Sequence, residues 1–234
     1  MIEEQDFEAF LYISKNKYKI FVDDKKNSKN LYKQEFKIDN EINLDDLSYL
    51  SKFLDENIYR IEKLVGSFIK DITLIIENDK ILTTDIGIKK KNSERHQNQD
   101  NIKNYLTEVK DSFKENYQDQ IIMHMLINNS DENGIENLSY DTDTNEGYLY
   151  LSVKFISISN SLTSIFERLL EKHQIQVNQY MSGEYIQNFF GKDFDELSMM
   201  ASKLKNGFNK NEVRLISKNI ENKGFFEKFF QLFS

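Results

Sequence analysis

The side chains best suited to acid–base or metal chemistry are three histidines, and nothing in the sequence groups them. His96 lies in a polar run, His124 lies within the apolar run 121–127, and His173 ends a predicted helix. Their spacing matches no metal-binding pattern. Because apolar residues flank His124 on both sides, we expect a hydrogen-bonded core histidine there rather than a ligand or a catalyst.

The other motifs of catalysis and cofactor binding are also missing from the sequence. Residues 141–147 are similar to a calcium-binding loop, but Gly147 falls one position late and Ser152 stands where the bidentate glutamate is needed. There is no glycine-rich phosphate loop, no Gly-x-Gly-x-x-Gly and no Gly-x-Ser-x-Gly. Zero cysteines exclude disulfides and thiolate metal sites. The sequence therefore predicts a protein that is not an enzyme and uses no metal or other cofactor.

The most distinctive pattern is the aromatic end of the chain, residues 223–234. At 100° per residue, its large apolar side chains fall within an arc of roughly 160°, and polar residues fill the opposite side. A helix of about ten residues is too short to be stable alone in water, so it should form only where the aromatic face is buried. A bilayer surface, a groove on a partner and the protein's own core are the three destinations, and we favour the bilayer. The predicted membrane-binding residues are Phe225, Phe226, Phe229, Phe230, Leu232 and Phe233, together with Lys223 and Lys228.

The distribution of charge is suited to an anionic lipid membrane surface. The whole chain has a formal net charge of −8, which argues against non-specific nucleic-acid binding. Residues 201–234 hold seven basic and three acidic residues, a net charge of +4, which leaves −12 for the first 200 residues. A basic, aromatic end on an acidic body favours anionic lipids. The alternative is a basic linker that only keeps the aromatic end soluble.

Composition and the amino terminus predict a cytoplasmic protein. Hydrophobic residues make up 39% and charged residues 30% of the chain, as in ordinary globular proteins. No apolar run is long enough to span a bilayer, and the acidic first six residues do not begin a signal peptide. We therefore expect a cytoplasmic protein that is peripheral on the inner face of the cell membrane.

The first part of the chain predicts a small sheet and a helix. Residues 9–13, 18–22 and 31–38 alternate as three antiparallel strands. A helix follows over residues 43–66, with Asn43 as its expected N-cap and Gly66 as its left-handed end. Strands at 71–77 and 81–88 come next, and the polar run 89–100 indicates a boundary loop.

The second part of the chain predicts further strands and helices and then a tether. Its apolar spacing predicts helices within 102–113, 160–173 and 184–190 and strands at 121–127, 148–158 and 175–180. Residues 193–205 are weakly helical, and the polar stretch 206–219 holds one candidate strand at 213–216. We interpret residues 191–222 as a tether with partial structure, which as coil would reach on the order of 30 Å.

This order of elements resembles the first half of an actin-type ATPase, and most of all FtsA, the actin-like protein of bacterial cell division. The resemblance is carried by Phe10-Leu11-Tyr12-Ile13-Ser14 in the opening strand, by the helix 43–66, and by Ile122-Met123-His124-Met125-Leu126 in an inserted module. The strand 149–158, the helix 160–173 and Ser182-Gly183-Glu184-Tyr185 continue it. Residues 224–233 are similar to that family's amphipathic membrane-targeting helix.

The resemblance implies an α+β fold, namely half of an actin-like (ribonuclease H-like) fold with an inserted small α+β module and a C-terminal amphipathic helix on a tether. The corresponding parts are 1–91 (first-lobe half), 92–173 (inserted module), 174–191 (return strand and helix), 192–222 (tether) and 223–234 (amphipathic helix). The family's second lobe is missing. Tyr12 and Ser14 stand where its phosphate-binding opening needs an acidic residue and a glycine. The resemblance therefore implies a nucleotide-free relative.

The function implied by the resemblance is that of a non-enzymatic membrane adaptor or scaffold in bacterial cell division, at the septum. Its partners would be the membrane, division proteins such as FtsZ or other components of the division machinery, and further copies of the chain. FtsZ docks mainly on the lobe that is missing here, so the protein partner stays open. The alternative is a soluble interaction module whose C-terminal helix docks in its own or a partner's groove. A degenerate ATPase that still binds nucleotide is a third option.

Overall fold

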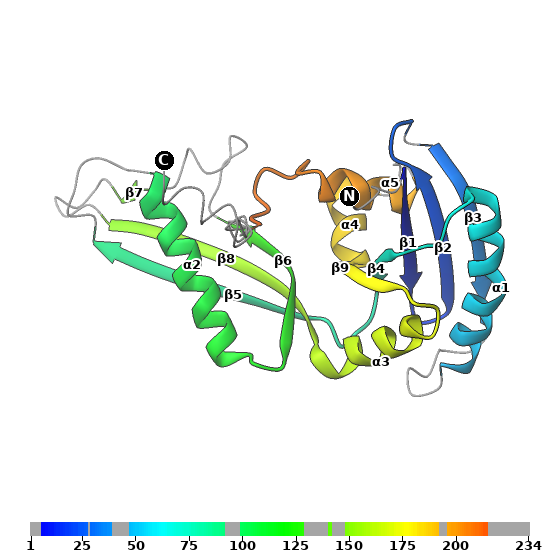
Figure 1. Cartoon of the computed structure of the whole chain (residues 1–234). Coiled ribbons are helices and arrows are strands. Elements are labelled where there is room, and N and C mark those ends of the chain that lie inside the picture. The colour runs from blue at the N-terminus through cyan, green and yellow to red at the C-terminus, as the bar shows by residue number, and fades with distance from the viewer. Residues whose placement is uncertain are drawn as a thin grey trace, which may run out of the picture.

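The computed structural model describes residues 6–27, 29–38, 47–91, 99–128, 140–141, 148–191 and 196–214. It is a mixed α+β structure in which two β-sheets lie side by side in an elongated body (Figure 1). The strands are β1 (Phe7–Ile13), β2 (Lys17–Asp24), β3 (Lys29–Lys37), β4 (Asp71–Ile76), β5 (Leu82–Lys91), β6 (Gln120–Ile127), β7 (Tyr140–Asp141), β8 (Tyr148–Ser159) and β9 (Gln176–Ser182). The helices are α1 (Ser48–Val65), α2 (Gln99–Asn116), α3 (Asn160–Glu171), α4 (Gly183–Phe190) and α5 (Leu197–Lys205).

The larger sheet has the strand order β3-β2-β1-β4-β9. Strands β1, β2 and β3 form the predicted antiparallel meander, whereas β1, β4 and β9 run parallel. Helices α1 and α3 pack on one face of this sheet, and α4 and α5 pack on the other. Strand β1 is therefore buried on both faces, as the central strand of a parallel arrangement must be.

Helix α1 forms where the repeat of apolar residues predicts it. Its apolar stripe is buried against the larger sheet, and Gly66 ends the helix in the left-handed conformation with φ of 75°. The helix begins at Ser48, with Leu47 at the N-cap position. Leu47, and not the expected Asn43, therefore holds the N-cap position, and Asn43 itself lies outside the described residues.

The smaller sheet has the strand order β5-β8-β6, is antiparallel, and carries the short strand β7 beside β8. Helix α2 covers it through a core that includes Val109, Phe113 and Phe155. Strand β5 pairs with β8 along its whole length, so residues 82–91 belong to this sheet and not to the first-lobe half ending at residue 91. Helix α3 packs in the core of the larger sheet and not in the predicted module 92–173.

The predicted tether, 192–222, is described only at residues 196–214, and these are packed against the body. Helix α5 buries Met200, Ala201 and Leu204 against the larger sheet. Four of its nine residues are buried, and one of these is the polar Ser198, which is why its apolar period is weak. None of the helices that the structure describes is long and apolar enough to cross a membrane.

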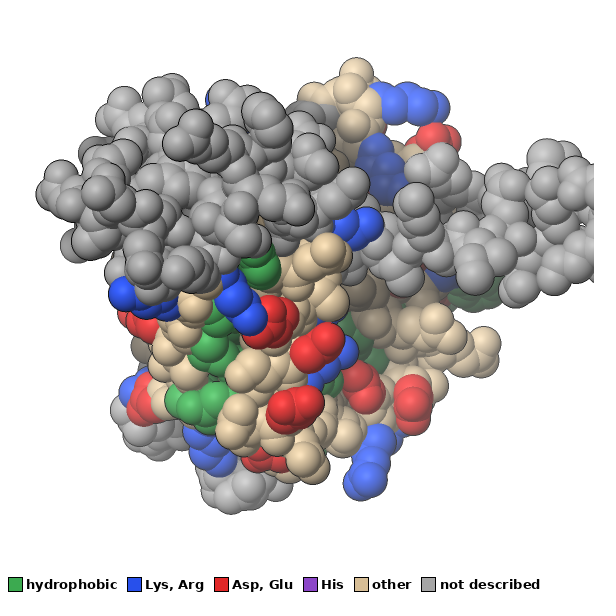
Figure 2. All heavy atoms as spheres, turned by 90° about the vertical axis from the view of Figure 1, so that its left-hand side faces the viewer, with side chains coloured by type: hydrophobic (Ala, Val, Ile, Leu, Met, Phe, Trp, Pro, Cys, Tyr) green, Lys and Arg blue, Asp and Glu red, His purple; other side chains and the backbone are tan. Residues whose placement is uncertain are grey.

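The end of the molecule formed by the smaller sheet and α2 is shown in Figure 2. Among the side chains described on this face, acidic and basic groups are interspersed with a few hydrophobic ones. These described charges form no patch of a single sign. A nucleic-acid-binding face would need such a patch of basic residues.

Candidate functional site

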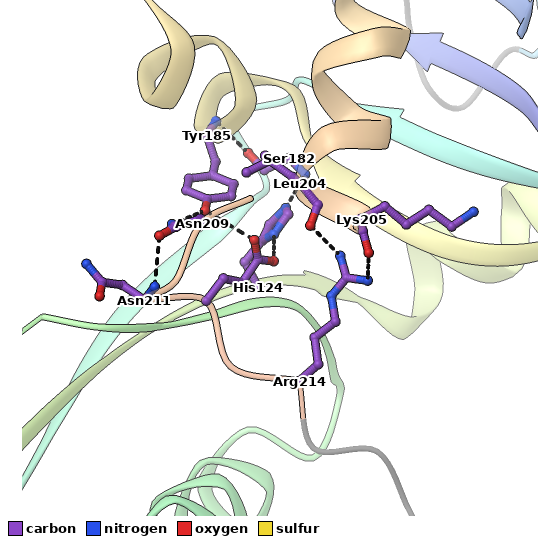
Figure 3. Close-up of polar contacts among 9 residues, drawn as sticks. His124, Ser182, Tyr185, Leu204, Lys205, Asn209, Asn211 and Arg214 are labelled. Atoms are coloured by element: carbon purple, nitrogen blue, oxygen red, sulfur yellow. Dashed lines mark hydrogen bonds and ion pairs between the residues drawn. The ribbon is translucent and has the colours of Figure 1, made fainter. Parts of the chain in front are cut away.

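The predicted membrane-binding residues, Phe225, Phe226, Phe229, Phe230, Leu232, Phe233, Lys223 and Lys228, lie outside the described residues. The described chain ends at Arg214. The structure therefore shows how the chain is held just before the aromatic end begins. We call residues 206–214 the junction segment, and Figure 3 shows its polar contacts.

The backbone of the junction segment adds to the edge of the smaller sheet. The Ile127 N–H donates to the Asn211 carbonyl over 2.9 Å, and the Val213 N–H donates to the Met125 carbonyl over 2.8 Å. Leu126 and Glu212 thus form an antiparallel bridge. The junction segment thus adds a short paired stretch beside strand β6. This stretch overlaps the candidate strand 213–216 at its first residues.

His124 links this edge to the larger sheet. It is buried, its Nε2 accepts the Ser182 N–H over 2.9 Å, and its Nδ1 lies 2.8 Å from Glu212 Oε1. Because Nε2 is an acceptor, the proton of the neutral ring must sit on Nδ1 and be donated to Glu212. The expectation of a hydrogen-bonded core histidine is confirmed.

Glu212 is the centre of the cluster, because a second, partly buried donor also reaches it. The Tyr185 hydroxyl donates to Oε2 over 3.2 Å and accepts from Asn209 Nδ2 over 2.7 Å. Burial, and then the negative charge of Glu212, raise the pKa of Tyr185 well above its ordinary value. Tyr185 therefore stays a donor. Asn209 in turn accepts the Asn211 N–H over 2.9 Å, which fixes the turn of the junction segment.

Arg214 closes the other side of the junction segment. Its guanidinium donates to the Lys205 carbonyl over 2.7 Å and to the Leu204 carbonyl over 3.3 Å. These carbonyls belong to the last turn of α5, where backbone acceptors lack helical partners and favour a cation. Contacts to β6, α4 and α5 together hold the junction segment between the two sheets (Figure 3).

A groove of about 590 Å³ continues from the junction segment along the open edge of β6. Strands β6 and β9 are edge strands of their sheets and lie beside each other. Lys110, Lys114 and Arg214 line the groove, and its one carboxylate, Glu212, is already bonded to His124. An open strand edge with excess positive charge can accept an extended, acidic peptide segment.

A second polar cluster occupies the region where the resemblance places a phosphate-binding opening. The Tyr12 hydroxyl donates to Glu77 Oε2 over 2.5 Å, and Gln187 Nε2 donates to the same oxygen over 2.9 Å. Burial, followed by the hydrogen bond to Glu77, raises the pKa of Tyr12 well above its ordinary value. The neighbouring hollow is lined by three acidic residues, Glu77, Asp79 and Glu184, and two lysines. This electrostatic balance is unfavourable for a polyphosphate.

The remaining predicted candidates lie apart from the junction segment. His173 is near Asp55, with 3.3 Å between Nε2 and Oδ1, whereas His96 and residues 142–147 fall outside the described residues. Within the described ranges, no group of three or more histidine and acidic side chains could hold a metal ion.

Sequence reasoning missed Glu212, Tyr185, Asn209 and Arg214. All four belong to polar or short-helix stretches, and their partners lie far away along the chain, as when His124 meets Glu212 across 88 positions. The only sequence signal for this cluster was His124, because a histidine flanked by apolar residues needs a hydrogen-bond partner that the local sequence does not supply.

No protein-family model and no curated protein matches this sequence. Among solved structures, the chain is similar to part of the PilM-PilN type IV pilus biogenesis complex, with a TM-score of 0.49, 9% identity, and coverage of 80% of this chain and 50% of that chain. It is also similar to the cytoplasmic domain of EpsL, an inner membrane component of the type II secretion system of Vibrio cholerae, with a TM-score of 0.36, 7% identity, and coverage of 77% and 58%. A third structure is a Bacteroides thetaiotaomicron protein with an actin-like ATPase fold and unknown function, with a TM-score of 0.32, 13% identity, and coverage of 81% and 58%.

The chain thus spans from 50% to 58% of the length of these three solved chains. At these TM-scores and identities, the likenesses carry no conclusion about function.

Proposed function

We propose that this protein is a non-enzymatic peripheral membrane adaptor of the bacterial cell-division machinery, held at the inner face of the cell membrane by its Phe-rich C-terminal helix. The junction segment carries the proposal. The chain just before the aromatic residues is bonded to strand β6 of the smaller sheet and to helices α4 and α5, which pack on the larger sheet, and only ten residues separate Arg214 from Phe225. A lipid-bound end would therefore hold the whole folded body close to the bilayer.

The assignment to cell division rests on the resemblance to FtsA. The antiparallel meander, the helix, the parallel strand, the second sheet and the return to β9 and α4 follow the order that the resemblance implies. The acidic side chains that line the hollow beside Tyr12 support a relative that works without nucleotide. We therefore place the protein among scaffolds and not among ATPases.

The expected strength of membrane binding is moderate. Burying five phenylalanines and a leucine supplies roughly 9–18 kcal/mol at full burial, of which an interfacial helix recovers only part. Ordering the helix costs about 1 kcal/mol or more per residue. Lys223 and Lys228 each add about 1 kcal/mol near an anionic surface. Binding should therefore be reversible and should depend on lipid charge.

The groove between β6 and β9 supports a second element of the adaptor, a place for a protein partner. We propose that an extended acidic segment of a division protein adds to the open edge of β6. Lys110 and Lys114 would face its carboxylates, and main-chain hydrogen bonds would supply affinity as in other strand additions.

Vesicle sedimentation tests the membrane proposal. The double variant Phe226→Asp/Phe230→Asp should no longer sediment with phosphatidylglycerol-containing vesicles and should keep the thermal transition of the intact protein. The matched control Gln231→Asp/Ser234→Asp adds the same two charges on the polar face and should weaken binding only mildly. Loss of the folded body in the first variant would mean that the aromatic residues are core, and the proposal would fail.

Salt separates the two contributions to binding. Raising the ionic strength should weaken vesicle binding without abolishing it, because burial of aromatic rings is not screened. Complete release of the protein by salt would show that charge alone held it and would contradict the role given to the phenylalanines.

A further inference from the structure

A compact aromatic patch lies beside the junction segment. Phe189 and Phe208 are 39% and 61% exposed, and the centres of their rings are 6.3 Å apart in an edge-on arrangement. Phe190 lies beneath both rings, 5.0 Å from Phe189 and 5.6 Å from Phe208. Two phenylalanines thus expose their rings on a preformed aromatic base, which we call the Phe189–Phe208 patch.

Backbone geometry holds Phe208 in this exposed position. Gly207 has φ of 82°, its N–H donates to the Leu204 carbonyl over 2.9 Å, and the Phe208 N–H donates to the Lys203 carbonyl over 3.1 Å. This is the Schellman ending of a helix, in which the residue after the glycine usually packs on an apolar side chain of the last turns. In α5 the residue that would receive this apolar contact is Lys203. Phe208 therefore packs on α4 instead and leaves most of its ring exposed.

The patch continues into a groove of about 740 Å³ that runs along α5. Phe208 and Met199 contribute apolar surface to it, Glu8, Asp23 and Asp24 contribute carboxylates, and Lys25 and Lys203 contribute ammonium groups. Hydrogen bonds from Asn27 lower the pKa of Asp24, so that its carboxylate stays ionised at neutral pH. Apolar surface beside a small excess of carboxylates can contact a short helix with aromatic and basic faces.

The aromatic end of the chain is within reach of the patch. The Arg214 side chain and the Phe208 backbone contact carbonyls of the same last turn of α5, so the described chain ends near the turn that holds Phe208. The ten residues that precede Phe225 span about 17 Å as a coil, and more when extended.

From this placement we propose that, away from a membrane, residues 224–233 dock on the Phe189–Phe208 patch of their own body, so that docking and lipid binding compete. The inference rests on the proposed function, since it concerns the same membrane-binding residues. Docking would cover the aromatic face of residues 224–233 in the cytoplasm. An anionic bilayer would compete for that face and so release these residues from the patch.

A short linker makes even a weak contact effective. Its effective concentration is on the order of 1 mM, so an intrinsic dissociation constant between about 0.1 and 1 mM would leave half or more of the molecules docked. Vesicle affinity would then be reduced about two- to tenfold, because only the undocked fraction is competent to bind.

A spin label tests the docking directly. The chain has no cysteine, so Ser234→Cys offers a unique site for a nitroxide on the otherwise intact protein. In the absence of lipid, the label should broaden the amide resonances of residues 189–191 and 206–208. Vesicles that contain phosphatidylglycerol should restore these resonances.

Vesicle titration supplies the second measurement. Phe189→Ser/Phe208→Ser should remove the broadening and raise vesicle affinity about two- to tenfold. The control Phe68→Ser changes a side chain that is 77% exposed elsewhere on the surface and should alter neither readout.

The outcomes separate this inference from the membrane proposal. Vesicle binding without any broadening in lipid-free solution overturns the docking and leaves the membrane proposal in place. Broadening without vesicle binding supports the docking and overturns the membrane proposal. Broadening of unlabelled, isotope-enriched protein by a labelled second copy would show docking between molecules and overturn the inference.

Discussion

Removing the Glu212 side chain should release the junction segment while leaving both sheets folded. Its side chain is only 5% exposed and accepts hydrogen bonds from His124 and Tyr185. In Glu212→Ala, the buried His124 and the partly buried Tyr185 would both lose their acceptor. Each such donor costs about 1–3 kcal/mol, and the longer Tyr185 bond belongs at the lower end. We therefore expect a loss of about 3 kcal/mol for docking of the segment.

Amide hydrogen exchange measures this loss at two positions that report only on docking. The N–H groups of Ile127 and Val213 donate across the contact between β6 and the junction segment. A local opening that becomes about 3 kcal/mol easier should accelerate their exchange about 10²-fold, because every 1.4 kcal/mol is tenfold. Leu11, in the central strand β1, should keep its wild-type exchange.

Glu212→Gln is the matched control for this experiment. The amide oxygen can still accept from His124 Nδ1, whereas the amide NH2 cannot accept from the Tyr185 hydroxyl. The charge and the longer of the two hydrogen bonds are therefore lost, and exchange at both reporters should rise about fivefold, for about 1 kcal/mol. Unchanged protection of Ile127 and Val213 in Glu212→Ala would refute the reasoning. Equal acceleration at Leu11 would also refute it, because the segment would then be part of the global core.

Two further predictions concern the second polar cluster and the two tyrosines that donate to carboxylates. In Gly183→Ala, the new Cβ would lie 3.2 Å from a ring carbon of Tyr12 and 3.3 Å from Glu77 Cβ, so a loss of about 1–3 kcal/mol in the free energy of unfolding is expected from urea titration; Gly87→Ala, with open space around it, should cause no such clash. The pKa values of Tyr12 and Tyr185 are raised by burial and neighbouring carboxylates, so their contribution to stability is complete below the unfolded pKa near 10 and is lost as pH rises above it. Thermal midpoints should fall above about pH 10, whereas an absorbance titration in which every tyrosine of the folded protein ionises together near 10 would contradict this.

Elements that bury a regular stripe of side chains could be predicted from the sequence. Helix α1 and the meander of β1, β2 and β3 were predicted because their apolar period is sustained, and Gly66 marks the C-terminal end of α1. Helix α5 gave a weak signal, because one short face meets the core. The pairing of β5 with β8 could not be anticipated, because it joins residues about 57–75 positions apart along the chain.

The junction segment marks the limit of reasoning from local pattern. Its residues are polar, and each of its decisive bonds is made to a partner elsewhere in the fold, such as His124 or Tyr185. A polar stretch was therefore interpreted as tether, although its described part is packed. Only His124 indicated that a polar partner packs there, because a buried imidazole ring must find hydrogen-bond partners.

The most direct test of the account is the position in the cell of a fluorescently tagged chain, intact and without residues 221–234. The intact chain should lie at the cell membrane and concentrate at the division site, and the shortened chain should be spread through the cytoplasm with its body still folded. A shortened chain that keeps the membrane position would contradict the claim that these residues hold the protein there.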